Sequence, residues 1–152
     1  MSLQFRNVDA DPAGPVQQWP YEALVTAIER GTISDWARIT KQISISPWGP
    51  VARQVEEYLS YSSPYGVAPL LQRAIARARR DAEVRERREV AAEIRDHVGR
   101  SGLTQAEFAA RVGTSRSRLS TYCTGSVTPS AALIARMRRV ADQAARDRGA
   151  GP

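Results

Sequence analysis

The chain has 152 residues, of which 42% are hydrophobic and 25% charged, and its formal net charge is +6. This length suits one domain or two small ones, and the composition is ordinary for a soluble protein. The sequence has no apolar run of roughly 18 residues, which excludes a membrane-spanning helix. Its single cysteine excludes an internal disulfide and a cysteine-rich zinc site. The first residues contain no basic segment followed by an apolar one, so we expect no secretory signal and a cytoplasmic protein.

The first half of the chain predicts a flexible arm followed by a small helical domain. Residues 1–16 contain Asp, Pro and Gly without periodicity, so we expect a flexible arm. Residues 17–80 are expected to form an all-helical domain of four helices, because apolar residues recur at helical spacing between turn signals. The expected helix starts lie at Pro20, at Thr32 with capping-box spacing to Asp35, at Pro50 and near Val67.

The aromatic residues of this domain are interpreted as packing residues. Trp19, Trp36, Trp48 and four tyrosines lie in it, and aromatic side chains supply much of the burial in small domains. The expected apolar sides of the second and fourth helices include Ile33 and Leu70. No catalytic or cofactor constellation is present, so the expected role of residues 17–80 is dimerisation or partner binding.

A highly charged stretch follows at residues 81–88. Asp81 with Arg85, and Glu83 with Arg87, are acid-then-base pairs at i,i+4, and each favours a helix by a few tenths of a kcal/mol. Apolar residues are sparse, so the stretch is expected to be an exposed, charged helical connector. A break into a linker is one alternative.

From Glu89 onward the helical period is clean again. Val90, Ile94 and Val98 form an apolar stripe that ends before Gly102. Thr104 and Glu107 then have capping-box spacing at the start of the next helix. That helix buries Phe108, Ala109 and Val112, and Gly113 allows the tight turn after it.

The helix predicted for residues 116–123 has two different sides. At about 100° per residue, Leu119 and Tyr122 point inward together. The outward side carries no apolar side chain and is flanked by arginine near its N-terminal end. Arginine can bridge guanine O6 and N7, and serine or threonine can bond base edges or phosphates. The outward and flanking residues are Arg116, Ser117, Arg118, Ser120 and Thr121.

The charges around this helix have one sign. No Asp or Glu occurs between Glu107 and Asp142, and a window without acids is what a polyanion-binding surface needs. On charge alone, a solvated surface in an arginine-rich protein is equally compatible. The arginines of the window are Arg111, Arg116, Arg118, Arg136, Arg138 and Arg139.

Residues 89–143 resemble the Xre/Cro-type helix-turn-helix domain of phage repressors and bacterial regulators. The matching pattern is residues 103–109, then 112–115, then Leu119, Tyr122, Gly125, Pro129 and Ser130. The resemblance implies a five-helix, lambda-repressor-like DNA-binding domain whose third helix enters the major groove. The chain departs from many members at Cys123, where they have Glu or Asn. The whole chain is therefore expected to be all-α, with the charged connector joining its two domains.

The resemblance also implies roles for individual residues. Gln105 would contact phosphate and brace the recognition helix. Arg116, Ser117 and Thr121 would sit at base edges, and Arg118 and Ser120 would touch bases or phosphates. In the loop after the helix, Ser126 and Thr128 would meet the DNA backbone.

Two functions from different classes follow. The first is a transcriptional repressor that binds a double-stranded DNA operator as a homodimer in the nucleoid. The second is an antitoxin, in which residues 17–80 bind and neutralise a toxin while the helix-turn-helix domain regulates its own operon. A helix-turn-helix module that has lost DNA binding is disfavoured by the acid-free window. The charged connector could also contact the DNA backbone.

The remaining features favour structural roles. Cys123 is interpreted as a small core residue and His97 as a surface histidine, since the chain offers too few ligands for a metal site. We expect no cofactor, no membrane contact and no enzymatic activity, because no catalytic set is present. Residues 144–152 are expected to be a flexible tail.

Overall fold

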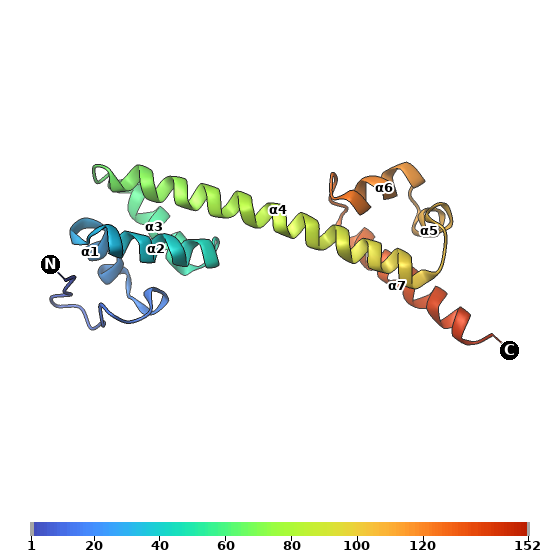
Figure 1. Cartoon of the computed structure of the whole chain (residues 1–152), viewed down its shortest axis with the longest axis horizontal. Coiled ribbons are helices and arrows are strands. Elements are labelled where there is room, and N and C mark those ends of the chain that lie inside the picture. The colour runs from blue at the N-terminus through green and yellow to red at the C-terminus, as the bar shows by residue number, and fades with distance from the viewer. Residues whose placement is uncertain (1, 152) are drawn as a thin grey trace. The chain divides into compact units, whose positions relative to one another are not determined.

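The computed structural model describes residues 2–151, and the expected arm and tail each extend one residue beyond them, to Met1 and Pro152. Among the described residues there is no strand, which confirms the predicted all-α fold (Figure 1). No helix in this part of the chain is long and apolar enough to cross a membrane. The elements are η1 (Val16–Gln18), α1 (Tyr21–Arg30), α2 (Ile33–Ile45), α3 (Pro50–Tyr61), α4 (Val67–Ser101), α5 (Gln105–Val112), α6 (Arg116–Thr124) and α7 (Ala131–Gly149).

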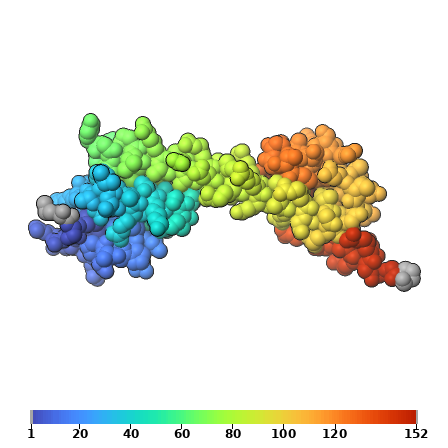
Figure 2. Space-filling view, in the orientation of Figure 1, coloured from blue at the N-terminus to red at the C-terminus, as the bar shows by residue number. Residues whose placement is uncertain are grey.

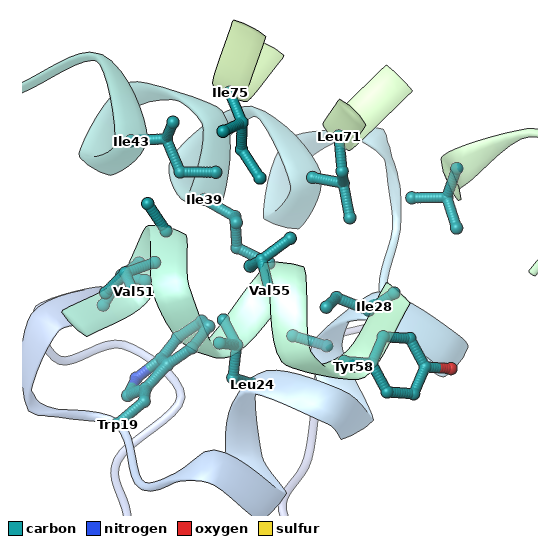
Figure 3. Packing of buried hydrophobic residues seen from close by; sticks show 14 of the residues in the cluster. Trp19, Leu24, Ile28, Ile39, Ile43, Val51, Val55, Tyr58, Leu71 and Ile75 are labelled. Carbon is teal, nitrogen blue, oxygen red and sulfur yellow. The ribbon is translucent and has the colours of Figure 1, made fainter. Parts of the chain in front are cut away.

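The chain divides into two compact units between Ala82 and Glu83. In the first unit, α1, α2 and α3 pack together with the beginning of α4 around one apolar core (Figure 3). The helix starts agree with the predicted signals: Pro50 opens α3, and the Thr32 N–H donates to Asp35 Oδ2 at 2.8 Å before α2. The core includes Trp19, Leu24, Ile28, Ile39, Ile43, Val55, Tyr58, Leu71 and Ile75.

The expected arm does not hang free of the first unit. Phe5 packs edge-on against Trp19, with ring centroids 5.2 Å apart. The Arg38 guanidinium lies 4.8 Å over the Trp19 ring and donates to the Pro12 and Gly14 carbonyls at 2.7 and 2.6 Å. The prediction of a flexible arm missed these contacts, because the partners lie beyond the arm, Trp19 just before α1 and Arg38 in α2.

Two residues assigned to the apolar sides of helices are exposed instead. Ile33 is 77% exposed and Leu70 is 45% exposed. At about 100° per residue, Ile33 lies about 120° around α2 from the buried Ile39, and Leu70 lies about 100° around α4 from the buried Leu71. Both residues therefore fall outside the buried stripe of their own helix.

The charged stretch at residues 81–88 is helical, because α4 runs unbroken through it. The expected ion pairs are absent from this part of the structure. Asp81 approaches Arg77 instead, at 3.9 Å, and within residues 2–151 no carboxylate lies within ion-pair distance of Arg85 or Arg87. The helix is therefore stabilised by its backbone and by the packing of its two ends, not by the predicted pairs.

The second unit is formed by the end of α4 with α5, α6 and α7 (Figure 1). The described part of this unit thus has four helical segments, not the five that the resemblance implies. The residues expected as a flexible tail continue α7 to Gly149, and Ala144 is buried. The core consists of Ile94, Phe108, Ala109, Val112, Leu119, Cys123, Met137 and Ala141.

Candidate nucleic-acid interface

Helix α5 is fixed at both ends by local hydrogen bonds. At its start the Glu107 N–H donates to Thr104 Oγ1 at 3.2 Å, and the Thr104 N–H donates to Glu107 Oε2 at 2.9 Å, which is the predicted capping box. The bond from the Thr104 N–H, and after it the Thr104 side chain, hold the pKa of the Glu107 carboxyl below its ordinary value, because they favour the ionised form. At its end Gly113 adopts φ 80°, a left-handed conformation that glycine accommodates without strain.

Helix α6 follows after a turn of three residues, and its ends are equally defined. The Ser115 hydroxyl accepts from the Arg118 N–H at 3.1 Å, as a helix N-cap does. The C-terminal end carries Gly125 at φ 78°, and Arg95 Nη1 donates to the Cys123 carbonyl at 2.5 Å. A helix of nine residues has few internal hydrogen bonds, so these contacts at its ends decide whether it forms.

The inner side of α6 differs slightly from the prediction. Leu119 is fully buried as expected, whereas Tyr122 is only half-buried and Cys123 takes the second core position. Burial raises the pKa of the Cys123 thiol, so at neutral pH the thiol is protonated and a poor nucleophile. The interpretation of Cys123 as a small core residue agrees with this environment.

The outer side of α6 is polar and open to solvent. Arg116, Ser117, Arg118 and Ser120 are exposed, and Thr121 is half-buried. The Thr121 hydroxyl donates to the Arg118 carbonyl at 2.6 Å. Its proton is therefore already used within the helix, and Thr121 has only its acceptor lone pairs free for a base edge.

The other predicted contact residues lie at the ends of neighbouring segments. Gln105 is the first residue of α5 and is exposed there. Ser126 and Thr128 are exposed in the loop after α6, and Ser126 donates to the Thr121 carbonyl at 3.2 Å. The structure thus places Ser126 against α6. Among the described residues, no side-chain hydrogen bond joins Gln105 to α6.

The arginines of the acid-free window divide into two groups. Arg136 donates to the Val112 carbonyl at the end of α5 at 2.8 Å, and Arg138 pairs with Glu93 at 3.1 Å. These two stabilise the unit itself, which the sequence did not reveal, because their partners lie 24 and 45 residues away. The remaining arginines of the window, whose side chains have neither an ion pair nor a hydrogen bond to any described residue, are Arg111, Arg116, Arg118 and Arg139.

His97 is buried, with 4% of its surface exposed, so the expectation of a surface histidine is wrong. Its Nδ1 lies 2.8 Å from Arg100 Nη2, and its Nε2 lies 3.2 Å from Glu93 Oε1. Since arginine can only donate, Nδ1 accepts and the neutral ring donates from Nε2. The ring therefore links two residues of its own helix, and among the described residues no group of three or more potential metal ligands is present.

One comparison with known proteins gave a match. Residues 75–148, about half of the chain, match a family model described as a helix-turn-helix domain. The match covers the second half of α4 and all of α5, α6 and α7. Searches of curated proteins and of solved structures found no match.

Proposed function

We propose, on the premise that residues 75–148 form a helix-turn-helix domain, that this chain is a sequence-specific regulator that binds a double-stranded DNA operator and represses transcription. The observation that carries the proposal is the outer side of α6. Its exposed residues are arginine and hydroxyl side chains, while Leu119 anchors the opposite side in the core. A short helix held in this way can enter the major groove with its polar side forward.

The proposed contacts follow from the positions of the side chains. Arg116 and Ser117 lie in the first turn of α6, where a recognition helix meets base edges. Arg118, Ser120 and Thr121 extend the contact to bases or phosphates. Gln105 at the start of α5, with Ser126 and Thr128 after α6, would position the domain on the backbone.

Selection of bound fragments from a genomic or random DNA pool tests the proposal. We expect the full chain to enrich one short sequence, and a homodimer to enrich two half-sites about one helical turn apart. Arg116→Ala is then expected to weaken binding to that sequence by about 1–3 kcal/mol, the size of a bidentate base contact.

Arg139→Ala is the matched control, because Arg139 is exposed on α7 and has no acidic partner among the described residues. We expect this variant to bind the selected DNA nearly as well as the wild type. Equal affinities of Arg116→Ala and the wild type, with the fold intact, would remove Arg116 from the interface. Failure of the wild-type chain to enrich any sequence would contradict the proposal as a whole.

A second candidate function, that of an antitoxin, is supported by the surface of the first unit. This unit has its own core and exposes Tyr61 by 66% and Tyr65 completely, while Ile33 is also open to solvent. Exposed aromatic residues of this kind are enriched where proteins bind one another. In this proposal residues 17–80 bind a toxin, and the second unit regulates the operon.

Co-expression with the product of the neighbouring gene tests this candidate. If that product arrests growth, we expect the full chain to relieve the arrest and Tyr61→Ala/Tyr65→Ala to relieve it less. Arg116→Ala should still relieve the arrest, because it changes only the proposed DNA contact. If the neighbouring product is harmless, or does not bind the chain, the antitoxin proposal is wrong and only the proposed regulator function stands.

A further inference from the structure

We propose that Arg87 and Arg88 of α4 form a second DNA-backbone contact, which binds phosphates flanking the sequence that α6 enters. The inference rests on the proposed DNA-binding function and extends it to a helix that precedes the helix-turn-helix pair. The sequence leaves contact with the DNA backbone open as one alternative for the charged stretch at residues 81–88, and the proposal selects it. The ligand is the phosphodiester backbone, so the contact adds affinity without base preference.

The first support is the position of the loop after α6. A Cβ built on Gly125 would lie 3.5 Å from the Arg87 carbonyl oxygen and 3.5 Å from Ala91 Cβ. The loop therefore begins directly against this turn of α4. Figure 2 shows the atoms of α6 and its loop, in orange, adjoining the yellow-green atoms of α4 on one surface. A backbone that reaches Ser126 in the loop thus passes close to Arg87 and Arg88.

The second support is the separation of charges around α4. At about 100° per residue, Arg88 and Arg95 lie within about 60° of Ala91 on the same side. Arg95 reaches the Cys123 carbonyl of α6, which fixes this side as the one that faces α6. The acidic residues of this turn and its neighbours lie farther from Ala91, since Glu83, Glu86 and Glu93 are about 80° or more away in the other direction and Glu89 is about 160° away beyond Arg88.

The opposite side of α4 has a different partner. Glu93 pairs there with Arg138 of α7 at 3.1 Å. The acids near Arg88 thus face α7 or solvent, and the arginines face the side of the loop. A phosphate approaching beside α6 would therefore meet Arg87 and Arg88, about 40° and 60° from Ala91, before it meets the carboxylates of Glu83 and Glu89.

The third support is that both guanidiniums are available. Arg87 and Arg88 are exposed, and neither forms an ion pair with any residue from 2 to 151. Most other arginines close to this core are already engaged, since Arg95 and Arg136 bind helix carbonyls and Arg138 pairs with Glu93. A guanidinium without an internal partner keeps its paired N–H groups for a phosphate.

The test measures how the affinity of the full chain for its selected duplex depends on salt. Each phosphate contact contributes about 0.9 to the slope of log K against log salt concentration. We expect Arg88→Gln to lower the slope by about 1 and Arg87→Gln/Arg88→Gln to lower it by about 2. The double variant should bind about tenfold more weakly at moderate salt, as expected for two exposed charge contacts. Its preference among operator variants should stay the same.

Arg85→Gln is the matched control. It removes one exposed charge from the same helix, but Arg85 lies about 120° from Ala91 and faces away from the loop. We expect its slope to equal that of the wild type. If Arg88→Gln and Arg85→Gln have equal slopes while the wild type binds its selected DNA, the proposed contact is wrong and the regulator proposal stands. If the wild type selects no DNA, both proposals fail.

Discussion

The two units of this chain are stabilised in different ways. In the first unit, large apolar side chains fill the core, and only α2 of its three complete helices has a side-chain capping box. In the second unit, α5, α6 and α7 all begin at a serine or threonine whose hydroxyl accepts from the helix backbone. Bonds from arginine to backbone carbonyls occur in both units, at Arg100, Val112 and Cys123 in the second and at Pro12, Gly14 and Pro47 in the first.

This difference follows from the length and exposure of the helices. Helices α5 and α6 have eight and nine residues, so unpaired groups at their ends are a large share of their backbone. The outer side of α6 also has no apolar side chain to bury, which limits what packing can contribute. Caps at the ends stabilise such a helix without using the side that we propose for DNA.

The two units also differ in net charge, and the second unit is the more basic one. Residues 83–152 contain 13 arginines and 8 acidic residues, whereas residues 1–82 contain 9 basic and 8 acidic residues. Among residues 2–151, exposed large apolar side chains show the opposite distribution, with six of eight in the first unit. The basic composition of the second unit favours a polyanion as partner, and the exposed apolar side chains of the first unit favour a protein surface.

The largest expected effect comes from a substitution in the core of one unit, which tests whether the two cores are independent. Phe108 is fully buried in the second unit, and Phe108→Ala should lower the free energy of unfolding of that unit by about 3–5 kcal/mol. Calorimetry of the full chain should then resolve two transitions, with only one of them shifted, and DNA binding should be lost.

Leu24→Ala is the reciprocal variant, because Leu24 is buried in the first core. It should shift the other transition by about 2–5 kcal/mol and leave the DNA-binding unit folded. A single transition that moves equally in both variants would contradict the separation of the cores. In that case α4 would couple the two units into one cooperative structure.

Much of this organisation could be predicted from the sequence, because it depends on local patterns. Pro50, Thr104 and Ser115 mark helix starts by their own backbone and side-chain chemistry, and the structure confirms each of them. Leu119 was placed inside from helical periodicity alone. The polar side of α6, which defines the candidate interface, followed from the same periodicity.

The features that could not be predicted depend on residues far apart in the chain. The residues next to Arg136 in the sequence do not indicate that it binds a carbonyl of α5. Those next to Phe5 do not indicate that it packs against Trp19. The burial of His97 likewise depends on the helices packed around α4. Periodicity identifies the apolar stripe of a helix, but the width of the covered area is set by neighbouring helices, which is why Ile33 was misplaced.

The next largest effect concerns the arginine caps of the second unit. Arg136→Ala removes the donor to the Val112 carbonyl and should lower the free energy of unfolding of this unit by about 1–2 kcal/mol. Chemical denaturation followed by circular dichroism measures it. Arg139→Ala, three residues along the same helix, should change stability by less than about 0.5 kcal/mol. Equal losses in both variants would assign the effect to helix charge and not to the cap.

A smaller effect is expected at the start of α6. Ser115→Ala removes the acceptor for the Arg118 N–H and should destabilise the unit by about 1 kcal/mol. Ser115→Asp keeps an acceptor at the N-cap and should restore stability. Hydrogen exchange of the first α6 amides, which reports local opening, should increase in the alanine variant only. Unchanged exchange in both variants would mean that α6 is held by Leu119 alone.

The smallest expected effect is a dependence on pH that originates at Glu107. Hydrogen bonds from Thr104 lower the pKa of the Glu107 carboxyl below its ordinary value of 4.5. A carboxyl with a lowered folded-state pKa stabilises the folded state above the unfolded-state pKa, and this contribution is lost as the pH falls through the folded-state pKa. The second unit should therefore unfold more easily in acid, and Glu107→Gln, which can still accept the Thr104 N–H, should weaken that dependence.

The Glu93 carboxyl acts in the same direction, because its pKa is lowered first by Arg138 and then by His97. Melting the wild type, Glu107→Gln and Glu93→Gln between neutral pH and the acid range separates the two carboxyls. If Glu107→Gln follows the wild-type curve throughout, the capping box contributes no proton-linked stability, and the geometry at Thr104 alone defines the start of α5.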